Sequence, residues 1–403
     1  MLDRRRFLAK AAAAGLVLGG SSLAFEHLID RDPEPTPMPR PVGRLPARQH
    51  AWDTSLARDV HGNPVPPRFQ RLLFFDLDEA PGHTDVRGLE AALRKLERRY
   101  RWSPAGVLFA VGWGPRYFER TLGVRSPIER PRPLSAFELP TLDDYDLCLH
   151  IACDRETRLT AVERKLVGVG GALRWRETRS GFVGAPLPAA RQQVGGIPSG
   201  EPVPAEAPLY MGFKSGYRRN QASEDAITIS QGPLAGGTTM HVSRMRLRLD
   251  DWYGLLDERE RVARMFAPQV SPVQVGRFTT DAPSHPELLD EAARRYGVVG
   301  HAQASARARR QGRPRILRRD FDSADGGEAA LHFVSLQRTI ADFVATRIAM
   351  NAAHSAYLTP AITDVVNNGI NEFIFVTHRA NYLIPPRVQR SFPLLPGREA
   401  AFA

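Results

Sequence analysis

The sequence predicts an α+β protein with two domains. Residues 71–182 carry the pattern strand, helix, strand twice, and the second half of the chain repeats strands and helices less regularly. Between the halves, residues 183–209 are rich in Pro, Gly and Ala, which is typical of a connection between domains. The 403 residues, of which 42% are hydrophobic and 25% charged, have the composition of a soluble globular protein with room for two or three domains.

The first half follows the order of a ferredoxin-like split unit, in which helices pack on one side of an antiparallel sheet. Its apolar residues alternate in the predicted strands and recur at helical spacing in the predicted helices. The predicted elements are strands at 71–77, 105–112, 145–152 and 173–182 and helices at 86–100 and 157–166. We expect this domain to span residues 68–190.

The second half, expected to span residues 205–403, shows a related but less regular pattern. Its predicted elements are strands at 240–249, 331–337 and 371–377 and helices at 252–265 and 340–353. Without reference to any known family, the residues predict two α+β domains and no more specific fold.

The N-terminus has the features of a twin-arginine export signal. Arg4-Arg5-Arg6 precedes an apolar run at 11–18, and small residues follow at 21–24, so that residues 1–24 form the predicted signal. An amphipathic first helix is the weaker alternative because the charges gather at one end. The apolar run falls short of the about 20 residues that a spanning helix needs. We therefore expect export, with the protein periplasmic, extracellular or anchored by an uncleaved signal, and no stable membrane span once the signal is removed.

Residues 25–67 are predicted to be a Pro-rich linker, because each proline fixes its own backbone angle and removes a hydrogen-bond donor. The net charge of +11 is spread along the chain without a nucleic-acid-binding motif, so we expect no nucleic-acid partner. Cys148 and Cys153 lie five residues apart on a predicted strand, roughly 16 Å at about 3.3 Å per residue, which favours two buried free thiols.

The most informative motif joins His301 to a later pair of arginines. His301 precedes a basic stretch that ends in Arg315-Ile316-Leu317-Arg318-Arg319-Asp320-Phe321, and a strand-like run follows at 326–338. An imidazole can hold a haem iron, and an arginine can polarise what binds opposite. Taken alone, a histidine near arginines is more often part of a basic surface patch. The ordered run of elements instead resembles the C-terminal signature of the dye-decolourising (DyP-type) haem peroxidases.

A second resemblance lies at Met211-Gly212-Phe213-Lys214-Ser215-Gly216, where that family carries Gly-x-x-Asp-Gly. The resemblance implies that Gly212, Phe213 and Gly216 contact the cofactor, since glycines let backbone pass close to a flat ring. Ser215 stands at the position of the family's acid. A serine cannot take a proton from peroxide as a carboxylate does, and such general base catalysis is worth roughly 10²- to 10⁴-fold.

The resemblance implies a duplicated ferredoxin-like fold, with two antiparallel sheets and helices packed on them, in the dimeric α+β barrel-like superfamily. It implies haem b (iron protoporphyrin IX) with His301 as the proximal iron ligand and Arg318 as the distal cation. Arg319 is the fallback for that cation, or a contact of a haem propionate. Asp320 is a candidate replacement carboxylate, with a salt bridge to a nearby arginine as the more common role for such a residue.

The implied function is an exported haem peroxidase that oxidises an organic or metal donor with hydrogen peroxide. Its expected partners are hydrogen peroxide and a small electron donor, and a homo-oligomer stays open. The alternatives are a haem-binding, haem-carrying or deferrochelatase-like protein without efficient turnover, and a relative of this fold that has lost haem. Motifs of hydrolases, kinases and zinc enzymes do not occur in the sequence.

Overall fold

The computed structural model describes residues 45–58, 64–183, 203, 207–213, 221–277 and 286–396. Residues 45–403 group into one compact unit. The predicted twin-arginine signal, most of the predicted linker's first half, and Ser215 and Gly216 of the glycine-rich motif lie outside the described residues.

The first half has the predicted order of elements, and the pattern of apolar residues located the four predicted strands and two predicted helices to within three residues. Two strand–helix–strand sets build an antiparallel arrangement in which β1 lies between β4 and β5. The elements are β1 (Phe69–Leu77), α3 (His83–Arg99), β2 (Leu108–Trp113), β3 (Thr141–Leu142), β4 (Leu147–Cys153), α4 (Glu156–Val167) and β5 (Leu173–Phe182). The two-residue strand β3 was not predicted.

The second half contains three long strands and a larger set of short helices. The strands are β6 (Thr238–Leu247), β7 (Leu317–Arg318), β8 (Phe321–Ser323), β9 (Ala330–Gln337) and β10 (Ile374–Ile384). The helices are α6 (Leu249–Gly254), α7 (Glu258–Met265), α8 (Pro272–Arg277), α9 (Leu289–Tyr296), α10 (His301–Ala306) and α11 (Ile340–Met350).

The prediction of one helix over 252–265 is wrong, because α6 ends at Gly254 and a new helix begins at Glu258, after the N-cap residue Asp257. The Asp257 side chain accepts a hydrogen bond from the backbone N–H of Glu260 at 2.8 Å, and the Glu260 side chain accepts one from the N–H of Asp257 at 2.8 Å. This reciprocal cap satisfies two donors that a helix start leaves open, and therefore ends α6 and begins α7.

The expected two separate sheets are replaced by one closed ring of eight strands. The ring runs β2-β4-β1-β5-β8-β9-β6-β10 and returns to β2. Phe182 of β5 pairs with Asp322 of β8, and Leu383 of β10 pairs with Trp113 of β2, so both edges of each half are joined to the other half. Such closure leaves no free sheet edge in the ring. The two remaining strands are not members of the ring: β3 pairs with β10, and β7 pairs with β9.

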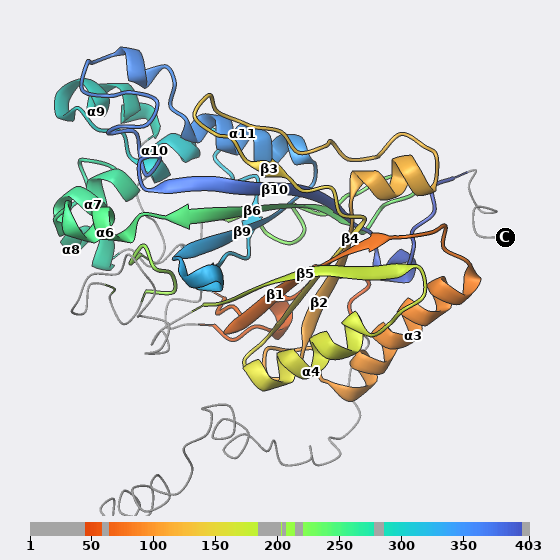
Figure 1. Cartoon of the computed structure of the whole chain (residues 1–403). Coiled ribbons are helices and arrows are strands. Elements are labelled where there is room, and N and C mark those ends of the chain that lie inside the picture. Colours follow the sequence, from red (N-terminus) through yellow and green to blue (C-terminus); the bar gives the residue numbers. More distant parts are fainter. Residues whose placement is uncertain are drawn as a thin grey trace, which may run out of the picture. The chain divides into compact units, whose positions relative to one another are not determined.

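The ring separates an inner core from an outer layer of helices. Alternate residues of the strands point inward and pack together, among them Leu72, Phe74, Met240, Val334 and Tyr382. On the outer face, α3 and α4 cover the strands of the first half, while α11 packs on β6 and β9, and α10 packs on α11 (Figure 1).

Residues 45–58, which fall within the predicted linker, pack against the ring. We call this segment the arm. The Gln49 side chain is fully buried and lies between β2 and the residues that follow β10. It accepts a hydrogen bond from the Val111 N–H at 3.0 Å and donates one to the Pro385 carbonyl at 2.8 Å. The folded part of the chain therefore begins well before Arg68.

Cys148 and Cys153 are buried free thiols on β4, which confirms the prediction from their spacing. Among the described residues, none of the helices combines the length and the apolar character needed to cross a membrane.

Replacing Gln49 by Met is expected to lower the free energy of unfolding by about 2 kcal/mol or more, because each buried polar group left unpaired costs about 1–3 kcal/mol. Urea unfolding followed by circular dichroism measures the change. Arg48→Met is the matched control in the same segment. It removes a partly exposed ion pair with Asp225, worth about 1 kcal/mol or less, and a hydrogen bond to Thr228. Equal losses in the two variants would contradict the role given to Gln49.

Candidate functional site

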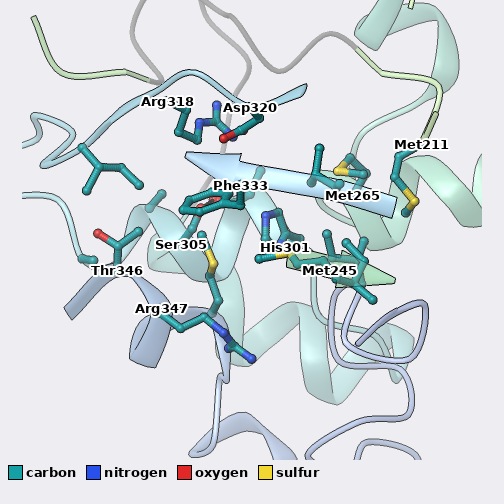
Figure 2. Close-up of a pocket in the computed structure, with 18 of the residues that line it drawn as sticks. Met211, Met245, Met265, His301, Ser305, Arg318, Asp320, Phe333, Thr346 and Arg347 are labelled. Carbon is teal, nitrogen blue, oxygen red and sulfur yellow. Dashed lines mark hydrogen bonds between the residues drawn. The ribbon is translucent and has the colours of Figure 1, made fainter. Parts of the chain in front are cut away.

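A cavity lies on the outer face of β6, β9 and β10, enclosed by α7, α10 and α11 (Figure 2). The cavity has an enclosed volume of about 200 Å³ and opens to solvent at its mouth. The enclosed part is smaller than the roughly 300–1,000 Å³ of typical ligand pockets.

The floor of the cavity is apolar because one face of each strand turns toward it. Val376 of β10, Met245 of β6 and Leu331 of β9 are direct neighbours across the three strands, and all three line the cavity. The lining also holds three further methionines, Met211, Met265 and Met350. Thioether side chains adapt to irregular and aromatic surfaces, so this floor suits a flat apolar ligand.

His301 enters the cavity from the first position of α10. Two glycines allow the close packing of the backbone around it. A Cβ on Gly300 would meet the Phe266 carbonyl oxygen at 2.0 Å, and a Cβ on Gly369 would meet the backbone nitrogen of His301 at 3.3 Å. Gly369 also has a positive φ of 57°, which favours glycine. The close packing of the backbone at these two glycines therefore fixes the position of the His301 backbone, from which the imidazole extends into the cavity.

The His301 imidazole is held in its neutral form. Burial, followed by the positive charges of Arg318 and Arg347, lowers the pKa of His301 to about 3. A neutral imidazole has a lone pair on one ring nitrogen, which is the form that binds a metal.

Arg318 and Asp320 lie together on the side of the cavity across from His301 (Figure 2). The Arg318 backbone N–H donates to the side-chain oxygen of Gln221 at 2.7 Å, and an Asp320 carboxylate oxygen accepts from the Val334 N–H at 3.1 Å. Burial raises the pKa of Asp320 to about 7, against the opposing effects of the Arg318 charge and the Val334 N–H. Near neutral pH this carboxyl group can therefore both give and accept a proton.

Arg319 does not line the cavity, in contrast to its predicted contact with the cofactor. Its guanidinium lies among buried residues, where it donates to the His50 carbonyl at 2.6 Å and to the Glu224 carboxylate at 3.1 Å. The physical reason is the two-residue period of extended backbone. Since Arg318 and Asp320 turn toward the cavity, the residue between them must turn away.

Arg347 of α11 is a cavity residue that the sequence did not reveal. One guanidinium nitrogen donates to a Glu138 carboxylate oxygen at 2.6 Å, and Arg379 of β10 donates to the other oxygen at 2.7 Å. All three side chains are buried. Because Glu138 lies 209 residues before Arg347, in the other half of the chain, no local pattern could have linked them.

The glycine-rich motif reaches the cavity through Phe213, whose ring packs edge-on against Trp252 and Phe266. Gly212 precedes it with a φ of 82°, a conformation that L-residues rarely adopt. The structure thus brings His301, Arg318, Asp320 and Phe213 to one cavity, with Gly212 adjacent.

The cavity lining carries four arginines, Arg309, Arg315, Arg318 and Arg347, and one carboxylate, Asp320. Arg347 pairs with Glu138 and Arg315 with Asp342, so the remaining excess of positive charge is small. It suits an anionic group on a ligand with a flat body. Within the described ranges, no group of three or more His, Cys, Asp or Glu side chains is placed to hold a metal ion. An iron held in a porphyrin needs only one axial side chain from the protein.

Comparison with known proteins gives the family of the chain and solved structures with the same fold. The model of a family of unknown function, DUF7405, matches residues 67–386, and the chain belongs to this family. No functionally curated protein matches the sequence.

Solved structures with the same fold are DyP-type peroxidases. A DyP-type peroxidase from Cellulomonas bogoriensis is 22% identical with a TM-score of 0.57, over 82% of this chain and 95% of that one. A putative DyP-type peroxidase protein from Shewanella oneidensis is 16% identical with a TM-score of 0.57, over 80% and 94%. A DypB variant from Rhodococcus jostii RHA1, solved in complex with heme, is 15% identical with a TM-score of 0.56, over 81% and 96%. The protein therefore has the fold of the DyP-type peroxidases.

The raised pKa of Asp320 predicts a pH-dependent effect of Asp320→Asn. In the unfolded chain the carboxyl titrates near 3.9, so between about pH 4 and pH 7 the folded protein binds this proton more tightly. This contribution to stability is present at low pH and is lost as the pH rises through that window. The variant should therefore be more stable, relative to the wild type, at about pH 8 than at about pH 5.

Urea unfolding of both proteins at the two pH values tests this expectation. Asp225→Asn is the control, because the Asp225 side chain is 85% exposed and carries no comparable burial cost. A stability difference between Asp320→Asn and the wild type that is the same at both pH values would contradict the assignment.

Proposed function

We propose that the protein is a haem-dependent peroxidase of the DyP type, which uses hydrogen peroxide to oxidise an organic or metal donor. The observation that carries this proposal is the cavity itself. A neutral imidazole, His301, faces the Arg318 guanidinium and the Asp320 carboxyl across an apolar space. These are the groups that a haem iron and a bound peroxide require on opposite sides.

The residues present fit haem b. His301 would hold the iron, and the apolar floor formed by Met245, Leu331 and Val376 would contact the ring. Two carboxylates of such a ring need cationic partners, and Arg309 and Arg315 line the same cavity. They take over the propionate contact that the sequence had suggested for Arg319.

When bound, haem supplies the iron that accepts electrons from the donor and reacts with peroxide. The chain supplies the proton chemistry and the charge. The Arg318 guanidinium can stabilise the negative charge that develops as the peroxide O–O bond breaks. Asp320, with a pKa of about 7, can take the proton from one peroxide oxygen and return it to the other. Ser215, at the position of the family's acid, would then donate a hydrogen bond or orient a water.

The replacement of an acid by Ser215, which the resemblance implies, would also favour a second candidate function. A haem-binding or haem-carrying protein, including one of the deferrochelatase type, needs His301 and the cavity but no proton acceptor. Export through the twin-arginine pathway suits both functions, because this route carries proteins that have folded around a cofactor. A small organic or metal electron donor is part of the same proposal, and so is the association of the chain into a homo-oligomer.

Substitution of His301 by Ala is expected to abolish the spectrum of a histidine-bound ferric haem. Titration of the purified protein with hemin, followed in the Soret region, measures binding and ligation together. His354→Ala is the matched control, since this side chain is 72% exposed and lies outside the cavity lining. Spectra of His301→Ala and wild type that coincide would show that another group binds the iron.

Substitution of Arg318 by Ala is expected to slow the reaction of the haem-loaded protein with hydrogen peroxide by about 10²- to 10³-fold, the usual effect of removing a group that stabilises developing charge. Stopped-flow absorbance gives the rate constant. Arg310→Ala is the control, since Arg310 pairs with Asp342 and is absent from the lining. Normal haem binding with equally slow reactions in wild type and Arg318→Ala would favour the haem-binding protein over the peroxidase.

A further inference from the structure

The arm contacts Arg319, the residue between the cavity residues Arg318 and Asp320. His50 and Trp52 of the arm are buried, with exposed fractions of 0% and 1%. The Arg319 guanidinium donates to the His50 carbonyl at 2.6 Å, and its central carbon lies 3.9 Å from the centroid of the Trp52 ring. Arg319 is thus held by a backbone acceptor and an aromatic face from the same short segment.

Glu224 joins the arm to Arg319 from a third segment. One Glu224 carboxylate oxygen accepts hydrogen bonds from the backbone N–H groups of Trp52 at 2.6 Å and Asp53 at 2.9 Å. The same oxygen accepts from the Arg319 guanidinium at 3.1 Å. Both charged side chains are at least nine-tenths buried. Removal of one charge from a buried pair leaves the other without compensation, so the three segments depend on one another.

The anchored residue is directly coupled to the cavity. The Arg319 N–H donates to the Val334 carbonyl at 2.7 Å, and the Val334 N–H donates to the Asp320 carboxylate at 3.1 Å. On the other side, the Arg318 N–H donates to Gln221, three residues before Glu224, at 2.7 Å. The Ala222 N–H also donates to the Ile316 carbonyl at 2.8 Å. A rotation of this backbone would turn Arg318 and Asp320 away from the cavity together.

We propose that Trp52, Glu224 and Arg319 form a latch that positions Arg318 and Asp320 at the cavity. In this proposal the three are positioning residues, because they act on the distal side through the backbone of residues 318–320. The latch rests on the proposed function for its catalytic consequence, whereas its effect on the backbone is independent of any cofactor. It also makes the arm, which falls within the predicted linker, part of the site.

The experiment compares Glu224→Gln with Asp225→Asn. The first removes the buried charge with little change of shape, and the second removes the neighbouring, largely exposed charge that pairs with Arg48. In the haem-free protein, hydrogen–deuterium exchange of the peptide containing residues 317–320 should be about tenfold faster in Glu224→Gln, the size expected for loss of a charge-assisted hydrogen bond. Asp225→Asn should exchange as the wild type does.

In the haem-loaded protein, fluoride binding reports on the distal cation, because a bound anion gains from the Arg318 guanidinium. Glu224→Gln should weaken fluoride binding in the same direction as Arg318→Ala, while Asp225→Asn leaves it unchanged. Arg319→Lys, which keeps the charge but loses the planar group, should show both effects and serves if Glu224→Gln does not fold.

Unchanged exchange in Glu224→Gln and Arg319→Lys would overturn the latch, whatever the cofactor. Faster exchange with unchanged fluoride affinity would overturn its positioning role. Failure of the wild type to bind hemin would instead overturn the proposed function, while the exchange experiment would still decide whether the backbone of residues 317–320 depends on the latch.

Discussion

The candidate site depends on the two-residue period of the extended backbone from Leu317 to Phe321. Leu317 and Phe321 pack inside the ring, and Arg319 turns the same way toward the arm. Arg318 and Asp320 must then turn outward to the cavity. A shift of one residue in this register would bury Arg318 and Asp320 and bring Arg319 to the cavity. The pairing of β7 and β8 with β9 is therefore what fixes the chemistry of the distal side.

Closure of the ring explains how residues from the first half come to support a cavity in the second. The pairing of β2 with β10 brings the first half against the second, and Glu138 reaches Arg347 across this junction. The arm makes a similar contribution through Gln49, which bonds to both sides of the same junction. Two separate sheets would leave Arg347 without its carboxylate, and an unpaired buried guanidinium is costly. The closed ring is thus part of the site as well as of the fold.

The sequence predicted most of the regular elements and the main cavity residues, but not the contacts between distant segments. The strands and helices of the first half show clear apolar periods, so their positions could be read directly. The last strand was predicted to end at residue 377, whereas β10 continues to Ile384. The part of β10 that was not predicted includes two buried polar residues. Arg379 pairs with the Glu138 carboxylate, and Asn381 donates a hydrogen bond to the Glu129 carbonyl. On the inner face of this part, Ala380, Tyr382 and Ile384 alternate toward the core, so the continuation of the strand was visible in the sequence. The polar partners of Arg379 and Asn381 were not, because they lie more than 200 residues away.

The paired arginines illustrate a different limit. Arg318 and Arg319 have the same chemistry, and the family resemblance favoured Arg318 for the distal side without excluding Arg319. The alternation of Leu317, Arg319 and Phe321 with Arg318 and Asp320 was visible in the sequence. Applied to that segment, it separates the two arginines, because apolar Leu317 and Phe321 mark the inward face. By contrast, Arg347 could not be found in this way, since its role rests on a cavity that only tertiary packing creates.

The proton chemistry of the site follows from a balance of burial and charge at Asp320. Burial raises its pKa, and Arg318 opposes that effect, which leaves the group near 7. Other arginines near the cavity add little to this balance, because Arg347 pairs with Glu138 and Arg315 with Asp342. A ferric iron held by His301 would add positive charge and move the pKa of Asp320 in the same direction as Arg318 does. In the proposed function, cofactor binding would therefore shift Asp320 toward its ionised form, which is the form that can accept a proton from peroxide.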